Sequence, residues 1–416
     1  MYNIISLESL CKEIIDCPHS TPKWQNEGIP VIRNYNLKDG KIDCTNLSFV
    51  SEEDYNERVK RAIPEESDII ISREAPMGVV GIVPKGFKCC LGQRLVLLKI
   101  DKSKCIPKYL LYSLMSEYVQ LQIRRINRTG SIVSNLNISS LKELKILLHN
   151  FEGQRKIANI LSAIDDKIQI NNQINQELAV MAKTLYDYWF VQFDFPDPNG
   201  KPYKSSGGKM VYHPELKREI PEGWGVETLK DFESKIITGK TPSRANSDNF
   251  GGEIPFITIG DIRGNTFIYS TSETLTDSGA SVQQNKYLPE GSLCVSCIAT
   301  VGEIGFTTEW SHTNQQINSI VFEDETNRYY LYLALKNYFE NANASAKTGN
   351  TFANMNKEDF SGIRIILPRN EIKNNFHKMT EPYFAQIKCL QGQNQELIQL
   401  RDWLLPMLMN GQVKVE

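Results

Sequence analysis

The side chains best suited to chemistry in this chain are three clustered arginines, Arg124, Arg125 and Arg128, in the segment IRRINRTGS (123–131). A guanidinium group presents a rigid fork of N–H donors, which fits both phosphate oxygens and the edge of a guanine base. The arginines lie at the end of a predicted helix, directly before Thr129, so they could instead be cations that offset the helix dipole. The chemistry they indicate is contact with nucleic acid, not bond making.

Strings that would predict catalysis are missing. The Gly-Lys-Thr string at 239–241 lacks the glycine that a phosphate-binding loop needs five positions earlier, where Ser234 stands, and Pro242 follows, so a turn is predicted. Asp165 and Asp166 are expected on a solvated helix face. The five histidines are isolated, without metal-ligand spacing. Neither a glycine loop for S-adenosylmethionine nor an Asn/Asp-Pro-Pro-aromatic clamp for a flipped adenine occurs. We therefore expect no catalytic residue, no metal and no cofactor.

Composition is that of an ordinary folded protein, 41% hydrophobic and 23% charged. No apolar run is long enough to span a membrane, and no signal peptide is recognisable. Nine cysteines, with a single CxxC at 294–297, favour free thiols in a reducing cytoplasm over disulfides or zinc.

Charge is distributed unevenly around a net value of −2. Residues 1–150 carry 21 Lys+Arg and 17 Asp+Glu, giving +4, whereas residues 215–369 carry 14 and 20, giving −6. A uniformly cationic nucleic-acid binder is excluded. Nucleic acid would have to be bound through local basic patches, with help from partner subunits.

The sequence repeats itself with a period near 220 residues, which is long enough to duplicate whole domains. Two pairs of segments share an offset of 225 and two share an offset of 219. The pairs are GIPVIR (28–33) with EIPFIT (253–258), IPEESD (63–68) with LPEGSL (288–293), TGSIVSNLN (129–137) with TGNTFANMN (348–356), and NQEL (175–178) with NQEL (394–397).

Each copy has two parts. The first part, 1–150 or 215–369, mixes β-rich runs with turn residues, and one short helix is predicted in each, at 107–124 and 326–341. The second part, 151–192 or 370–416, has the apolar spacing of a helix. Residues 193–214, rich in Gly, Ser, Pro and Lys, are predicted to link the copies.

The predicted helices are long enough to need a partner, since about 38 residues span roughly 57 Å. Each could pack on its own domain, but a seam of this length favours pairing of the two helices. The apolar positions are Ile157, Ile160, Ile164, Ile168, Ile174, Leu178, Met181 and Leu185, and their counterparts are Phe376, Met379, Tyr383, Ile387, Gln393, Leu397, Leu400 and Leu404.

Three stretches carry a resemblance to a known family: 151–190 with 193–216, ITGKTPSRANSDNFGGEIPFITIGDI (237–262), and LLPMLMNGQVKV (404–415). Together they resemble the specificity (S) subunits of type I restriction–modification systems, the HsdS family. The first copy departs from the pattern, because CPHSTPKW (17–24) stands where a GKTPS-like stretch would precede GIPVIR.

This resemblance implies an α+β fold: two α/β target-recognition domains related by internal duplication, joined by two long antiparallel coiled-coil helices. Each domain would read one half of a bipartite, asymmetric duplex DNA target. The chain would be non-catalytic, with one S subunit per complex. The helices would dock two methyltransferase (M) subunits and, through them, restriction (R) subunits.

The duplication separates two kinds of DNA contact. Positions that the copies share should be framework or phosphate contacts, and matched positions that differ, such as Ser131 and Asn350, are candidate base readers. The predicted DNA-binding residues of the first copy are Arg73, Arg94, Arg124, Arg125, Arg128, Thr129 and Ser131. Those of the second copy are Lys240, Ser243, Arg244, Arg263, Gln316, Lys347, Thr348, Asn350 and Thr351.

Aromatic residues crowd the end of the first long helix, in TLYDYWFVQFDFP (184–196). Some of them must pack on the core, but six aromatic residues in ten exceed what one helix end usually buries, so a docking surface for the methyltransferase is also predicted. The predicted docking residues are Tyr186, Tyr188, Trp189, Phe190, Phe193 and, in the second copy, Trp403.

Two other hypotheses stay open at this stage. The chain could be a coiled-coil scaffold or decoy of the same family whose lobes bind proteins instead of DNA. It could also be an orphan subunit that serves a nuclease–methylase of the related single-complex type. The target sequence and the spacer between its halves do not follow from the sequence.

Overall fold

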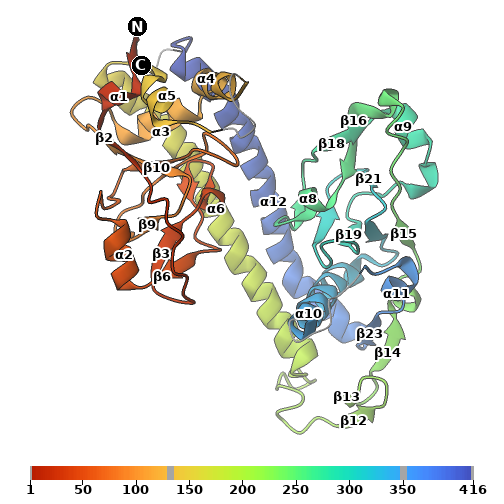
Figure 1. Cartoon of the computed structure of the whole chain (residues 1–416). Coiled ribbons are helices and arrows are strands. Elements are labelled where there is room, and N and C mark those ends of the chain that lie inside the picture. Colours follow the sequence, from red (N-terminus) through yellow and green to blue (C-terminus); the bar gives the residue numbers. More distant parts are fainter. Residues whose placement is uncertain (1, 129–134, 347–353, 414–416) are drawn as a thin grey trace. The chain divides into compact units, whose positions relative to one another are not determined.

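The computed structural model describes residues 2–128, 135–346 and 354–413, apart from the side chains of 127–128 and 343–346 (Figure 1). The chain forms two compact units. Unit 1 comprises Met1–Ile168 with Leu397–Glu416, and unit 2 comprises Gln169–Glu396. Each unit contains one α/β lobe and part of each of two long helices, α6 (Phe151–Tyr186) and α12 (Asn370–Met409).

The lobe of unit 1 is built from short strands in three separate sheets, with a small hairpin beside them. The main sheet is antiparallel, in the order β2 (Cys11–Asp16), β10 (Leu95–Ile100), β7 (Ile69–Ser72), β8 (Val80–Ile82). A second sheet has the order β6 (Ser48–Val50), β3 (Ile29–Ile32), β9 (Cys90–Leu91), and β1 (Asn3–Ser6) pairs with β11 (Lys145–Leu148). The helices are α1 (Leu7–Leu10), α2 (Glu52–Arg58), α3 (Pro107–Met115), α4 (Glu117–Arg128) and α5 (Ile138–Glu143).

The lobe of unit 2 repeats this arrangement. Its main sheet has the order β15 (Ile236–Thr238), β22 (Ile317–Ile320), β19 (Leu293–Ser296), β20 (Ile304–Thr307), β17 (Phe267–Ile268). The second sheet has the order β18 (Glu273–Leu275), β16 (Phe250–Ile257), β21 (His312–Thr313), and β14 (Gly225–Thr228) pairs with β23 (Arg364–Leu367). The helices are α7 (Leu229–Phe232), α8 (Ile259–Ile262), α9 (Asp277–Ser281), α10 (Arg328–Ala346) and α11 (Lys357–Ser361).

Strand pairing confirms the predicted internal duplication. β3 is antiparallel to β6 and parallel to β9, and β16 is likewise antiparallel to β18 and parallel to β21. The step from Ile29 to Ile254 in these strands is the offset of 225 in the repeated sequence, and the step from Lys145 to Arg364 is the offset of 219. The same topology in both lobes is what a duplicated domain requires.

The long helices are antiparallel in both units. In unit 1, Asp165 of α6 contacts Arg401 of α12. In unit 2, Asn171 of α6 contacts Asn394 of α12, and Tyr186 lies against Phe376 further along the pair. Residue numbers rise along one helix as they fall along the other, which confirms the predicted antiparallel pairing.

The buried stripe of α6 differs from the predicted apolar seam. Ile174 and Met181 are exposed, whereas Asn171 and Ala182 are fully buried. Helical spacing explains the difference, because a stripe that runs through Ile164 continues along the helix to 168, 171, 175, 178 and 182. The buried contact between α6 and α12 is therefore polar at its middle, where Asn171 meets Asn394.

The helix predicted over 107–124 is two helices. At Ser116 the backbone is extended, with φ −64° and ψ 148°, and this residue separates α3 from α4. Its hydroxyl donates to the carbonyl oxygen of Ser113, which closes the last turn of α3. A serine hydroxyl can compete with helical hydrogen bonds in this way, and apolar spacing does not reveal it.

Candidate nucleic-acid interface

Three segments meet at one end of the main sheet in unit 1. They are the β7–β8 loop (73–79), the β9–β10 turn (92–94) and the stretch that leads into α5 (135–137), which together we call the first loop cluster. The backbone N–H of Arg73 donates to the carbonyl oxygen of Arg94 at 2.8 Å, and the N–H of Leu136 donates to that of Arg73 at 3.0 Å.

Unit 2 holds the equivalent second loop cluster: the β19–β20 loop (297–303), the β21–β22 turn (314–316) and the stretch that leads into α11 (354–356). The N–H of Cys297 donates to the carbonyl oxygen of Gln316, and the N–H of Met355 donates to that of Cys297, both at 2.8 Å. Arg94 and Gln316, both predicted to bind DNA, therefore occupy matched positions in the backbone hydrogen bonds of the two clusters. The two clusters share a scaffold and differ in the side chains on it.

A serine organises the first loop in each cluster. The Ser72 hydroxyl donates to the Pro76 carbonyl oxygen at 2.6 Å and accepts from the backbone N–H of Val79 at 2.9 Å. The Ser296 hydroxyl makes the same two bonds, to Thr300 at 2.5 Å and from Glu303 at 2.9 Å.

Each loop also contains an alanine with positive φ, 45° at Ala75 and 66° at Ala299. A left-handed conformation is unfavourable for alanine, and it persists only where the surrounding bonds hold it. In unit 2, Asn354 contributes such a bond, because its Oδ1 accepts from the N–H of Ala299 at 3.2 Å. Its counterpart Asn135 accepts instead from the guanidinium of Arg73, also at 3.2 Å.

These serine and asparagine residues were not predicted to belong to the site. The asparagines could have been found, because the repeated strings SNLN and ANMN place both at the same position of the duplication.

The two predicted arginines of the first loop cluster have different surroundings. The Arg73 side chain is only 13% exposed, forms an ion pair with Asp16 at 2.8 Å and donates to the Leu136 carbonyl oxygen. Its guanidinium therefore stabilises the cluster. Arg94 is 56% exposed and pairs with Glu74 at 3.2 Å, so it is the arginine of this cluster that projects toward solvent.

The patch of Arg124, Arg125 and Arg128 lies on α4, immediately before residues outside the described part of the chain. Arg124 pairs with Glu117 of the same helix, and Arg125 is also exposed. Several predicted residues lie outside the described part of the chain. They are Thr129, Ser131, Lys347, Thr348, Asn350 and Thr351, together with the side chain of Arg128. DNA contact by this patch stays a prediction.

In unit 2 the predicted loop 239–244 packs along the β21–β22 turn. The backbone N–H of Lys240 donates to the Thr313 carbonyl oxygen at 3.0 Å, and Thr241 Oγ1 donates to Gln315 Oε1 at 2.6 Å. Gly239 permits this approach, because a Cβ there would lie 2.2 Å from the Asn314 carbonyl oxygen.

The predicted residues of this region are exposed, except Gln316, which is half-buried. The Lys240 ammonium has no ion pair among the described residues. Arg244 forms a bidentate pair with Glu273, at 2.8 Å for both contacts, and the carbonyl oxygen of Ser243 accepts from Asn249. Arg263 pairs with Glu303 at 3.3 Å, so it lies at the second loop cluster.

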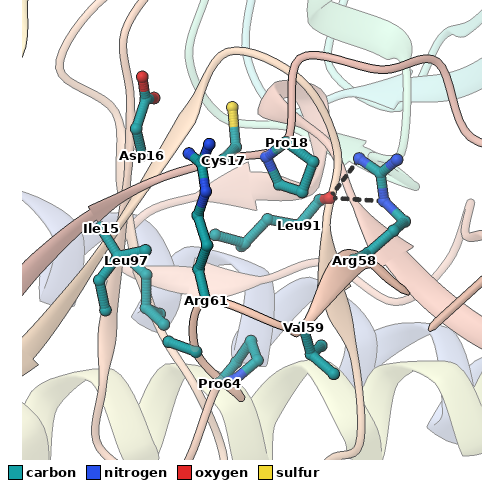
Figure 2. A pocket seen from close by; sticks show the side chains of 11 residues that line it. Ile15, Asp16, Cys17, Pro18, Arg58, Val59, Arg61, Pro64, Leu91 and Leu97 are labelled. Atoms are coloured by element: carbon teal, nitrogen blue, oxygen red, sulfur yellow. Dashed lines mark hydrogen bonds between the residues drawn. The ribbon is translucent and has the colours of Figure 1, made fainter. Parts of the chain in front are cut away.

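The segment 17–24 occupies the equivalent place in unit 1, although its sequence departs from the repeat. Gln93 Nε2 donates to the His19 carbonyl oxygen at 2.5 Å, which joins this segment to the β9–β10 turn. Figure 2 shows the small pocket beneath the segment, lined by Cys17, Pro18 and Arg58 among others.

Arg58 anchors the segment from below. It is buried, and its guanidinium donates twice to the Leu91 carbonyl oxygen, at 3.1 and 2.8 Å (Figure 2). It also donates to the Ser20 carbonyl oxygen at 3.2 Å. All of these acceptors are backbone atoms. Arg58 therefore positions the segment beside the first loop cluster.

The aromatic docking prediction is corrected by burial. Four of the six predicted residues lie in the core of unit 2, where their rings pack on Tyr330, Phe376 and Trp224. A buried ring cannot belong to a surface that a partner contacts, so only Tyr188 and Trp403, both exposed, remain candidates. The four buried residues are Tyr186, Trp189, Phe190 and Phe193.

Asp165 also differs from its prediction. It is buried, and its carboxylate accepts from the Tyr112 hydroxyl at 2.6 Å and from Arg401 at 3.1 Å. Burial, together with this hydrogen bond, raises the pKa of Tyr112 well above its ordinary value. The carboxylate is thus a structural link between α3, α6 and α12 in unit 1.

Other reactive groups are few in the parts of the chain that the structure describes. No cluster of three His, Cys, Asp or Glu residues is placed to hold a metal there. Most cysteines are buried, and burial raises the pKa of Cys89 to about 12. None of the described helices has both the length and the apolar character needed to cross a membrane.

The chain combines a duplicated α/β domain with matched loops and paired long helices. The model of the type I restriction modification DNA specificity domain matches the chain twice, over residues 5–180 and 221–399. The chain therefore belongs to this family, as its sequence predicted.

Individual proteins that are similar to this chain agree with the family assignment. The chain is 33% identical over 363 residues to the type I restriction enzyme HindI specificity subunit of Haemophilus influenzae, covering 74% of this chain and 78% of that one. It is 28% identical to the MjaIX specificity subunit of Methanocaldococcus jannaschii, covering 88% and 82%. A crystal structure of a type I S subunit from M. genitalium has the same fold, with TM-score 0.55 at 16% identity over 98% and 96% of the two chains.

Proposed function

We propose that this chain recognises a bipartite, asymmetric duplex DNA sequence, one half through each loop cluster, and directs partner subunits to it. The observation that carries the proposal is the pair of loop clusters. Their backbone hydrogen bonds are the same, yet Arg73 is matched by Cys297 and Arg94 by Gln316. A common scaffold with different side chains suits two readers of different half-sites, since base edges are distinguished by the donors and acceptors presented to them.

Methylation and cleavage would be carried out by other subunits. The exposed residues Tyr188 and Trp403 on the helical regions support docking of a methyltransferase there. In this proposal one specificity subunit binds two methyltransferase subunits, which in turn hold restriction subunits, and the assembly works in the cytoplasm. The chain contributes recognition without catalysis.

The test combines the purified full chain with its methyltransferase subunit and S-adenosylmethionine, and then maps the methylated adenines on genomic DNA. We expect a two-part motif for the complex and no methylation by either chain alone. Arg94→Ala should alter discrimination in one half of the motif, while Gln316→Ala should alter the other half. Methyl transfer by this chain alone, or a motif with a single part, would contradict the proposal.

A protein-binding scaffold is the competing hypothesis. Its support is the net charge of −6 over residues 215–369 and the carboxylate pairing of Arg244 and Arg263, which lower the cationic character of unit 2. Salt-dependent footprinting separates the two hypotheses, because only a reader protects two short patches of duplex and loses affinity as salt rises.

A further inference from the structure

An exposed arginine in unit 1 lies over two exposed aromatic rings. The Arg33 guanidinium carbon is 5.2 Å from the ring centroid of Trp24 and 4.8 Å from that of Tyr35. Arg33 Nη1 also donates to the Tyr35 hydroxyl at 3.3 Å. Trp24 is 44% exposed and Tyr35 is 48% exposed. Cation–π contact with both rings restrains the guanidinium, so its donors have a preferred orientation before any ligand arrives.

The charge of Arg33 has no carboxylate partner among residues 2–128, 135–346 and 354–413, where no ion pair with it is formed. The neighbouring arginines differ, because Arg73 pairs with Asp16 and Arg94 pairs with Glu74. A cation with fixed donors and no carboxylate partner is suited to a ligand that offers paired acceptors.

This aromatic–arginine cluster, Trp24 with Arg33 and Tyr35, adjoins the first loop cluster. Arg33 directly follows β3, and the N–H of Gly92 donates to the carbonyl oxygen of Ile32 at 2.7 Å. Asn34 Nδ2 donates to the Ala75 carbonyl oxygen at 2.5 Å. Two of the three segments of the first loop cluster therefore contact the residues on either side of Arg33.

The described residues of unit 2 contain no equivalent of this cluster at the matched positions. At the offset of 225, Arg33 corresponds to Thr258 and Tyr35 corresponds to Gly260. The Thr258 hydroxyl donates to Asp261 at 2.7 Å, within a helix cap. A phosphate contact would be equally useful in both units, because both would meet the same sugar–phosphate backbone of DNA. A feature confined to one unit is better suited to base reading.

We propose that Arg33 reads a guanine in the half-site that unit 1 binds, with Trp24 and Tyr35 as positioning residues. Two parallel N–H donors of a guanidinium match the O6 and N7 acceptors of guanine in the major groove, and this pattern is unique to that base. The inference rests on the proposed function and names one base of the target that unit 1 would select.

The test uses the full chain with its methyltransferase subunit and compares the methylation motifs of wild type and variants. Arg33→Gln should relax discrimination at one G·C pair in one half of the motif, on the order of tenfold to a hundredfold, and leave the other half unchanged. Trp24→Ala should weaken discrimination at the same pair to a smaller extent, since the guanidinium remains but is held less well.

Lys85→Gln is the matched control. Lys85 is an exposed cation beyond the far end of β8, so it lies at the opposite end of the β7–β8 pair from the loop 73–79. Its variant should keep the wild-type motif. Equal loss of methylation at all positions after Arg33→Gln would show a phosphate contact and overturn the inference. A wild-type half-site for unit 1 without any G·C pair would also overturn it. A wild-type complex without a two-part motif would instead refute the proposed function.

Discussion

Replacing Asp165 by alanine should destabilise unit 1 strongly, because it removes one partner of a buried ion pair. The Asp165 and Arg401 side chains are only 10% and 11% exposed, and their charged atoms lie 3.1 Å apart. The same carboxylate accepts from the Tyr112 hydroxyl at 2.6 Å. After Asp165→Ala, the guanidinium would remain buried without this carboxylate, and the phenol would lose its acceptor.

Breaking a buried pair in this way costs about 3–5 kcal/mol. Arg401 keeps a second partner, since its Nη2 lies 3.0 Å from Asp402 of the same helix. We therefore expect the lower end, about 3 kcal/mol, which is roughly a hundredfold in the unfolding equilibrium. The double variant Asp165→Ala with Arg401→Ala should lose little more than the single one, because no unpaired buried charge is left.

The assay is chemical denaturation of the full chain, followed by far-ultraviolet circular dichroism, with the transition of unit 1 compared between variants. Asp166→Ala is the matched control, because Asp166 is the neighbouring carboxylate on the same helix and is exposed. It should change the free energy of unfolding by less than about 0.5 kcal/mol. An equally small effect of Asp165→Ala, or a double variant equal to the sum of the single ones, would refute the reasoning.

Three further predictions concern unit 2. Burial lowers the pKa of His312 to about 4, so the unfolded chain binds a proton that the folded chain rejects between about pH 6.5 and 4. Stability should fall by up to about 3 kcal/mol as pH drops through this window, and His312→Gln should remove that dependence in denaturation curves; an unchanged slope would contradict it. Asn171→Leu combined with Asn394→Leu should raise the melting temperature but permit self-association in sedimentation, because a polar seam pair specifies register at a cost in stability. A lowered melting temperature would refute this account. Gly239→Ala should displace the loop 239–244 and weaken recognition of the half-site read by unit 2 in the methylation assay. Gly260→Ala is the control, because the added Cβ would be 3.8 Å from its nearest neighbour, and recognition should stay intact. Equal effects of the two variants would argue against a clash at Gly239 as the cause.

The duplication could be predicted from sequence because strand positions are repeated at nearly constant offsets. Ile29 and Ile254 lie in the matched strands β3 and β16, and the carbonyl oxygens of Arg94 and Gln316 accept matched hydrogen bonds. The environment of Asp165 could not be predicted, since its partners are remote in sequence at Tyr112 and Arg401. Helical periodicity shows which residues share a face, but it does not show what packs on that face.

The candidate site was predicted only in part for a related reason. Arginines can be recognised by type, but their roles depend on the carboxylates that the fold brings near them. Arg73 is braced by Asp16, 57 positions away in the sequence, and Arg94 meets Glu74 in the next loop. Arg33 was not predicted because its aromatic neighbour Trp24 stands well before it in the sequence, on the other side of β3. Ion pairs and ring contacts between residues distant in sequence distinguish an arginine that stabilises the loops from one that is available to contact a base.

Under the proposed function, the shared backbone of the loop clusters would allow two copies of one domain to recognise two different half-sites. The bonds that join the three segments run between main-chain atoms, from Arg73 and Cys297 to their matched acceptors. The left-handed conformations at Ala75 and Ala299 are held by the same serine-centred bonds in both units. Side chains at these positions can therefore differ without changing the loop that carries them. A DNA-recognition domain built in this way would keep its geometry while its donors and acceptors change. Its specificity would then depend on side chains that the scaffold does not need, such as Arg33 in our proposal.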